Sequence, residues 1–237
     1  MDRELTLVEH LNELRKRIII ALISLGIGTI LSLPFAAYLL RILRSPAAGL
    51  IEKLAFFSPQ EGFLIYMRVS FLCGFLIAFP VVAYQLWAFV SPAIEERFKR
   101  YIIHFVLFST ITFLAGALFA YLVLLPKALK FLLSFGMDDL EPVISASRYI
   151  SFVTTIILGC GLIFQMPVLS YLLTKLGLVN ARILRKKFKY AIVIIFVIAA
   201  VITPTTDIFN MSLLAVPMLF LYEISIWISA VARRRPA

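Results

Sequence analysis

The carboxylates near the start of the chain are its first candidates for chemistry. Glu13 lies four residues before Arg17, so on a helix the two side chains would form an i, i+4 ion pair. Glu13 also precedes, by a few residues, an apolar run that begins at Ile18. At a membrane surface an exposed carboxylate could bind a cationic partner instead. The residues alone leave both interpretations of Glu13 open.

A second acidic pair, Glu95 and Glu96, follows Ser91-Pro92 in a segment otherwise rich in lysine and arginine. One interpretation is a solvated helix start, because acidic side chains favour the first turn of a helix. The other is a pair of carboxylates that binds a cationic ligand. Both interpretations stay open.

Polar side chains inside apolar runs form the third group of candidates. They are Gln165 beside Pro167, and Glu223 in the middle of the last apolar run. Ionisable groups in lipid are costly and usually face the protein interior or mark function. For Glu223 a functional role and an interhelical hydrogen bond are both open. Asp207 precedes the last run and is placed to cap its helix.

Motifs for enzymatic chemistry are missing from the sequence. It contains no G-x-x-x-x-G-K-[ST], H-E-x-x-H or G-x-S-x-G. The two histidines, His10 and His104, have no metal-binding spacing, and Cys73 and Cys160 lie in apolar runs where thiols pack. We therefore predict no enzyme, no cofactor, no metal site and no disulfide.

The composition indicates which elements must position these residues. The chain is 62% hydrophobic and 15% charged, with a mean hydropathy of +1.00, whereas soluble domains are roughly 45–50% apolar and about 25% charged. The bilayer must therefore solvate most of the chain, and its long unalternated apolar runs favour helices over a barrel. We predict an all-α integral membrane protein that does not bind nucleic acid.

Six apolar runs predict six transmembrane helices. The fifth is short, since its apolar core from 190 to 202 would span about 20 Å of a ~30 Å hydrocarbon layer. We include it because Lys/Arg-rich and Pro-rich segments flank it. The predicted spans are Ile18–Leu40, Phe63–Val90, Tyr101–Leu125, Tyr149–Leu173, Tyr190–Thr203 and Met211–Ser229.

Lysine and arginine predict the orientation of these spans. Sixteen of these residues fall in the terminal segments and the loops on their side, against seven on the other side. Because positive residues gather in cytoplasmic segments, we predict that both termini are cytoplasmic. We expect no cleavable signal peptide, because the charged start is long and no small-residue cleavage site follows the first run.

Proline predicts the shape of the bundle. Prolines fall inside or at the ends of the spans, where they bend or break helices. We therefore predict bent helices that form a concave body. These prolines are Pro34, Pro80, Pro92, Pro167, Pro204 and Pro217.

Several motifs, taken together, resemble the TatC family of the twin-arginine protein export system. They occur in the family's order and cover nearly the whole chain. They are His10-Leu-x-Glu13-Leu-Arg15-Lys-Arg17, Tyr84-Gln85-x-Trp87-x-Phe89-x-x-Pro92, Phe164-x-x-Pro167, Leu184-Arg185-Lys186-Lys187 and Thr203-Pro204…Asp207.

The resemblance implies a function in protein transport. TatC proteins lie in a bacterial-type cytoplasmic (inner) membrane and recognise the twin-arginine signal peptides of folded cargo. They work with small single-span partners, TatA or TatB, and transport is driven by the proton-motive force. By resemblance we expect the chain to contact membrane lipids and to be oligomeric within the translocase.

The resemblance also implies signal-peptide residues. Glu13 and a loop acid are carried over, with Glu96 favoured over Glu95, and we add Arg15, Arg100 and Phe89 to the predicted site. Arginine offers a carboxylate a planar fork of donors, so such a site would prefer Arg-Arg to Lys-Lys. Neighbouring side chains of an extended peptide point to opposite sides, so two arginines would need two acidic contacts.

Gln165 is a departure from the TatC family pattern. Family members carry a glutamate where this chain has Gln165, and an amide cannot titrate, so the resemblance does not extend to a proton relay there.

Two other functions are alternatives to protein transport. A secondary transporter of a small solute would use Gln165 and Glu223 near the midplane. An intramembrane enzyme is the third interpretation. Binding of a twin-arginine peptide would discriminate among them.

Overall fold

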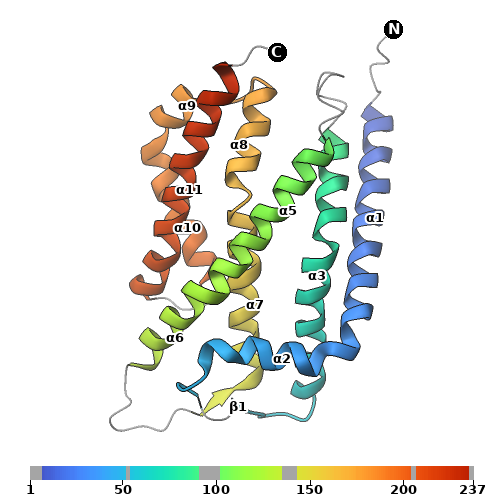
Figure 1. Cartoon of the computed structure of the whole chain (residues 1–237), viewed down its shortest axis with the longest axis vertical. Coiled ribbons are helices and arrows are strands. Elements are labelled where there is room, and N and C mark those ends of the chain that lie inside the picture. Colours follow the sequence, from blue (N-terminus) through green and yellow to red (C-terminus); the bar gives the residue numbers. More distant parts are fainter. Residues whose placement is uncertain (1–6, 52–53, 91–101, 135–142, 204–206, 235–237) are drawn as a thin grey trace.

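Long helices that run alongside one another make up most of the molecule (Figure 1). The computed structural model describes residues 7–51, 54–90, 102–134, 143–203 and 207–234. Within these residues the elements are α1 (Leu7–Ser32), η1 (Leu33–Phe35), α2 (Ala36–Arg44), η2 (Ser45–Ala47), β1 (Leu54–Ala55), α3 (Glu61–Val90), α5 (Ile102–Phe119), the π-helical η4 (Ala120–Leu124), α6 (Leu125–Leu133), β2 (Ile144–Ser145), α7 (Ala146–Ile163), α8 (Met166–Lys175), α9 (Ala181–Lys186), α10 (Phe188–Ile202) and α11 (Ile208–Arg234).

Five helical segments are long and apolar enough to cross a membrane, and α10 is a sixth, shorter apolar helix. With 15 residues, α10 is about 22 Å long. The predicted all-α membrane fold is therefore confirmed. The start of α1 and the end of α11 lie at one end of the bundle, which we call the terminal end, and α2 lies across the other, which we call the α2 end (Figure 1).

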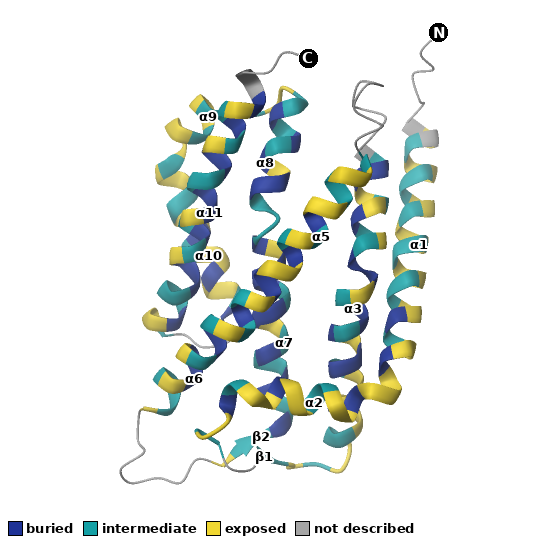
Figure 2. Ribbon diagram, viewed as in Figure 1, coloured by how far each residue is buried: buried dark blue, intermediate teal, exposed yellow. Residues whose placement is uncertain are grey.

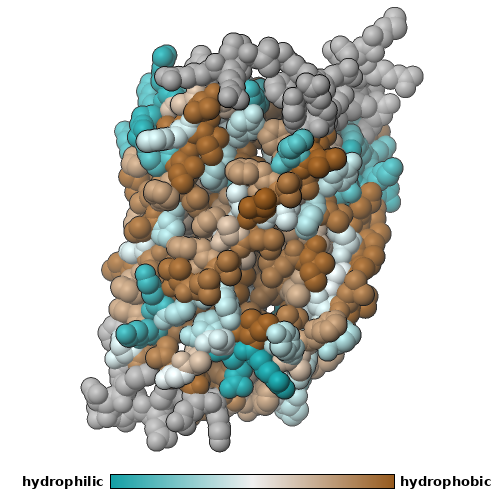
Figure 3. Space-filling model, viewed as in Figure 1, coloured by the Kyte–Doolittle hydropathy of each residue, from teal (hydrophilic) through white to brown (hydrophobic). Residues whose placement is uncertain are grey.

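The surface of the bundle is apolar where lipid would surround it. Exposed residues follow the outer side of α1, where Leu22 is 61% and Ile30 66% exposed, and of α10, where Val193 is 63% exposed (Figure 2). Figure 3 shows hydrophobic surface over the middle of the molecule, with most hydrophilic patches towards its two ends. Lipid tails solvate such a surface without penalty, whereas water would not.

Two prolines divide helices that the hydropathy pattern presents as continuous. Pro34 follows the end of α1 at Ser32, and the chain then turns through η1 into α2. The first predicted span, which continued to Leu40, is therefore one helix only as far as Ser32. Pro167 lies in the first turn of α8, just after the break from α7. Proline causes such breaks because it lacks an N–H and clashes with the preceding turn.

Close packing of α1 on α3 brings the first two spans together. A Cβ on Gly28 would lie 2.7 Å from the carbonyl oxygen of Gly74, so both positions require glycine. Ser32 Oγ donates to the Gly28 carbonyl at 2.8 Å and stays buried in this contact. Small residues let helix backbones approach closely in membranes. The contact fixes where the start of α1 lies relative to the end of α3.

The α2 end is closed by contacts between distant segments. Tyr121 and Tyr149 each donate a 2.8 Å hydrogen bond to a carbonyl in the last turn of α2, those of Ile42 and Leu43. Strands β1 and β2 pair in parallel, with Leu54 opposite Ile144. The two tyrosine bonds hold α2 against η4 and α7, and the strand pairing joins the segment after η2 to the start of α7.

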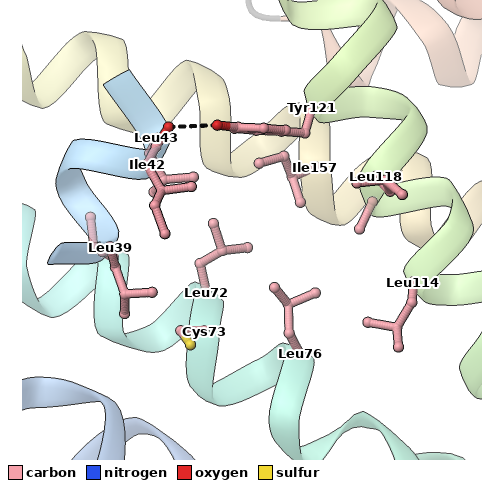
Figure 4. Close-up of a pocket in the computed structure, with 12 residues that line it drawn as sticks. Leu39, Ile42, Leu43, Leu72, Cys73, Leu76, Leu114, Leu118, Tyr121 and Ile157 are labelled. Atoms are coloured by element: carbon pink, nitrogen blue, oxygen red, sulfur yellow. Dashed lines mark hydrogen bonds between the residues drawn. The ribbon is translucent and has the colours of Figure 1, made fainter. Parts of the chain in front are cut away.

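An apolar cavity of about 420 Å³ opens between α2, α3, α5 and α7 (Figure 4). Leu72, Cys73 and Leu76 face it from α3, and Leu114 and Leu118 face it from α5. It gives the body the concave face predicted from the prolines. Cys73 and Cys160 are both free thiols, and Cys160 is buried.

Candidate functional site

Glu13 lies on the second turn of α1, at the terminal end of the bundle. Arg17 donates to Glu13 Oε1 through Nε at 3.1 Å and through Nη2 at 2.6 Å. The i, i+4 ion pair, one of the two interpretations that the sequence left open, is therefore present. Both bonds end on the same oxygen, and within the described residues no donor bonds to Oε2. The Glu13 side chain is 26% exposed, so Oε2 keeps its capacity to accept a hydrogen bond from a ligand.

The last turns of α3 complete the surroundings of this carboxylate. Arg17 Nη1 donates to Gln85 Oε1 at 3.3 Å. The ring of His10 stacks on Phe89 with 4.5 Å between centroids and 22° between planes. Two motifs that are far apart in the sequence, 10–17 and 84–89, therefore meet in space. We call His10, Glu13, Arg17, Gln85 and Phe89 the α1–α3 site.

Hydrogen bonds across the bundle position the end of α3. The indole N–H of Trp87 donates to Ser109 Oγ on α5 at 3.1 Å. Gln165, at the break between α7 and α8, donates to the Ser109 carbonyl at 3.0 Å and to Thr112 Oγ1 at 3.2 Å. The Gln165 amide thus joins α5 to the α7–α8 break. The transporter interpretation needs this amide in a solute site, and the structure uses it in helix packing.

Glu223 forms an ion pair between α11 and α9. Arg185 donates to Oε1 at 2.7 Å and to Oε2 at 3.1 Å, and the Trp227 indole donates to Oε1 at 3.3 Å. Of the two interpretations left open by the sequence, the interhelical hydrogen bond describes this carboxylate. It is made as a two-bond ion pair, which occupies both oxygens.

Asp207 caps α11. Its Oδ1 accepts from the Asn210 backbone N–H at 2.7 Å, and its Oδ2 accepts from the Asn210 side-chain amide at 2.9 Å. The predicted cap is therefore confirmed, and it satisfies an N–H that the helix start would otherwise leave unpaired.

Part of the predicted site lies outside the described residues. Glu95, Glu96 and Arg100 belong to the segment 91–101, so the second acidic contact stays a prediction. Arg15 lies on α1 and is exposed. Across the described ranges, no group of three or more His, Cys, Asp and Glu side chains is arranged to hold a metal ion. The chemistry that this arrangement supports is recognition through charged hydrogen bonds.

Comparison with known proteins decides the family. Residues 9–217 match the family described as "Sec-independent protein translocase protein (TatC)". The chain belongs to the TatC family. The Sec-independent protein translocase protein TatC of Aquifex aeolicus is 42% identical over 97% of this chain and 96% of its own. The TatC of Carboxydothermus hydrogenoformans is 37% identical over 96% of this chain and 94% of its own.

Solved structures support the same conclusion. The crystal structure titled "Twin Arginine Translocase Receptor- TatC" is similar over 95% of this chain and all of its own, with a TM-score of 0.86 and 42% identity. As a TatC family member the chain is a multi-pass membrane protein of a protein translocase. It is not an enzyme.

Two contacts of the α1–α3 site were missed by the sequence analysis. The Arg17–Gln85 hydrogen bond and the His10–Phe89 stack join residues 68 and 79 positions apart. Gln85 and Phe89 both belong to the TatC-like motif that ends α3, and His10 begins the N-terminal motif. The signal was therefore present as two motifs, but nothing in their spacing showed that they touch.

Proposed function

We propose that this TatC family member is the receptor and scaffold of a twin-arginine translocase, and that the α1–α3 site binds the signal peptide. The observation that carries the proposal is the Oε2 of Glu13, to which none of the described residues donates, at a partly exposed position between α1 and α3. The resemblance assigns Glu13 to signal-peptide binding, and the similar solved structures are of a twin-arginine translocase receptor.

Charge supports the proposed orientation of this site. Basic residues gather on α9 and the start of α10, at the same end of the bundle as the α1–α3 site (Figure 1). Since lysine and arginine favour the cytoplasmic side, we propose that the terminal end faces the cytoplasm of a bacterial-type inner membrane. The signal peptide would then reach Glu13 from the compartment in which its cargo folds.

The geometry suggests how a peptide arginine would bind. Its guanidinium donates to Glu13 Oε2 while Arg17 keeps its bonds to Oε1 and its contact with Gln85. Such charge-assisted bonds are short and directional, and a guanidinium makes them better than an ammonium group. The stacked rings of His10 and Phe89 offer an aromatic surface beside it. The second arginine is proposed to bind Glu96 or Glu95.

The scaffold role concerns the lipid-exposed helices. We propose that small single-span partners of the TatA or TatB kind dock on the bundle, since a body of this size cannot enclose a folded protein. Assembly into an oligomer and drive by the proton-motive force belong to the same proposal. The exposed apolar sides of the spans provide the surface for these contacts.

The test is peptide binding to the purified protein in detergent. A fluorescent twin-arginine signal peptide should bind the wild-type chain, and its Lys-Lys counterpart should bind at least about tenfold more weakly. Glu13→Ala and Glu96→Ala should each reduce binding of the Arg-Arg peptide. The control is Glu61→Ala, which removes a glutamate at the start of α3, at the α2 end. Equal binding of the two peptides by the wild-type chain would contradict the proposal.

A further inference from the structure

A second cavity with both charged and apolar walls lies at the terminal end, between α9 and α11. Its volume is about 460 Å³. The residues that line it are Ala181, Arg182, Arg185, Ile226, Trp227, Ala230 and Val231. It is separate from the α1–α3 site and contributes nothing to the proposed peptide binding. Its walls combine two guanidinium groups with an indole ring and aliphatic side chains.

The walls of this cavity are held in place by Glu223. Its carboxylate accepts from Arg185 on one side and from the Trp227 indole on the other. The Tyr222 hydroxyl also donates to the Leu184 carbonyl at 2.9 Å, which ties α9 to α11 a second time. The Arg185 and Trp227 walls are therefore preorganised, and a ligand would lose little free energy in ordering them.

The charge of the cavity is positive. The carboxylate of Glu223 neutralises Arg185 but engages only two of the five N–H donors of that guanidinium. Arg182 is exposed, and its side chain has no hydrogen bond or ion pair with another described residue. A bound anion would therefore meet Arg182 and the remaining donors of Arg185.

The surroundings of the cavity belong to a membrane interface. Trp227 is 68% and Val231 62% exposed, and Ile183 on α9 is 45% exposed. In Figure 3 hydrophilic surface over α9 adjoins hydrophobic surface at this end. Tryptophan is enriched where the hydrocarbon of a bilayer meets its headgroups. A ligand of this cavity must then present a negative charge to Arg182 and apolar groups to Trp227 and Val231.

We propose that the α9–α11 cavity binds an anionic phospholipid. The phosphate accepts hydrogen bonds from Arg182 and Arg185, and the upper part of an acyl chain packs on Trp227 and Val231. Basic pockets between transmembrane helices bind anionic headgroups for this reason. A zwitterionic lipid fits less well, because its ammonium group is repelled by the same two arginines.

The two tryptophans of the chain make the proposal measurable. Trp87 is 6% exposed and Trp227 68%, so a quencher in the lipid phase acts mainly on Trp227. The protein is reconstituted in phosphatidylcholine bilayers that contain a small fraction of brominated phosphatidylglycerol or brominated phosphatidylcholine. Fluorescence quenching then gives the relative affinity of the two lipids beside Trp227. In the Trp87→Phe variant Trp227 is the one remaining tryptophan, so this variant repeats the measurement without any fluorescence from Trp87.

We expect the affinity of brominated phosphatidylglycerol for the site beside Trp227 to be about fivefold higher than that of brominated phosphatidylcholine. This is the factor that corresponds to the attraction of one arginine to an anionic membrane surface. Arg182→Gln should reduce this preference to near unity. Lys189→Gln, which removes a charge from the same end but outside the cavity, should preserve most of it. Equal quenching by the two lipids, or a preference that survives Arg182→Gln, would overturn the proposal and favour a protein segment as the occupant.

Discussion

Two glutamate–arginine pairs at the terminal end of the bundle differ in how much of the carboxylate they use. Arg17 places both of the hydrogen bonds that it makes to Glu13 on one oxygen of that carboxylate. Arg185 places one bond on each oxygen of Glu223, and Trp227 adds a third. The first pair lies within one helix, and the second joins two helices.

Exposure does not separate the two carboxylates, since the Glu13 side chain is 26% exposed and that of Glu223 35%. What distinguishes the two carboxylates is the number of oxygens that accept hydrogen bonds from arginine. A carboxylate with one open oxygen can accept a further guanidinium, whereas a carboxylate with both oxygens paired stabilises the contact that pairs it. The same two residue types can therefore support recognition at one place and helix packing at another.

The largest effect is expected from a variant in which Glu13 and Arg17 exchange places. Combining Glu13→Arg with Arg17→Glu keeps an i, i+4 ion pair on α1 but moves the carboxylate one turn towards the middle of the span. We expect affinity for the twin-arginine peptide to fall about 30-fold or more, because loss of a close charge partner costs about 2–5 kcal/mol. Fluorescence anisotropy of the labelled peptide measures the change.

Arg17→Gln provides the matched control for this exchange. It removes the competing guanidinium and leaves Glu13 in place, so peptide affinity should be retained or increased. If Arg17→Gln weakened binding as much as the exchange, the open oxygen of Glu13 would not be what the peptide recognises.

A second test separates the helices that hold the first pair. A methyl group at Gly28 would meet the Gly74 backbone, so Gly28→Ala should lower the free energy of unfolding by about 1–3 kcal/mol through overpacking. Peptide affinity should fall with it, because α3 would move away from α1. Gly26→Ala is the control, since a Cβ there meets nothing within 4 Å. Equal effects of the two variants on unfolding and affinity would contradict this explanation.

A third test concerns the second pair. Glu223→Gln should lower the free energy of unfolding by about 1 kcal/mol, since it removes the charge from a two-bond pair that is partly exposed. Peptide affinity should stay unchanged. Thermal unfolding can be followed with a thiol-reactive dye, because Cys160 is buried in the folded state. A large loss of peptide affinity would remove the distinction between the two pairs.

The smallest expected effect lies outside both pairs. Gln165→Leu removes the hydrogen bonds to Ser109 and Thr112 and should cost about 0.6 kcal/mol of stability, a typical value between membrane helices. The same thermal assay measures it, with peptide affinity as the second readout. A loss of affinity as large as that of the Glu13 exchange would show that Gln165 belongs to the binding site.

Much of the fold could be predicted because the bilayer imposes it. Only helices and closed barrels satisfy backbone polar groups in lipid, and the long apolar runs, which do not alternate with polar residues, favour helices. The end of the first span could not be set by hydropathy, because the residues after Pro34 remain apolar while the chain turns into α2. The steric effect of Pro34 on the backbone, and not hydrophobicity, therefore determines where α1 ends.

In the candidate site, too, the local contacts could be predicted from the sequence and the contacts between distant residues could not. The Glu13–Arg17 pair and the Asp207 cap are local, so helical spacing was sufficient to offer the pair as one of two interpretations and to predict the cap. The contacts of Arg17 with Gln85 and of Arg185 with Glu223 join residues tens of positions apart. They depend on which helices pack together, and a single sequence does not contain that information in its spacing.

The parallel pairing of β1 with β2 has a consequence for the order in which the molecule is made. Leu54 and its partner Ile144 are separated by 90 positions. At about 5–20 residues per second, a ribosome adds Ile144 roughly 5–20 s after Leu54. During that interval α1 and α3 can insert and pack through Gly28 and Gly74, while β1 has no partner. The α2 end therefore cannot be completed before Ile144 is made, whereas every residue of the α1–α3 contact is available earlier.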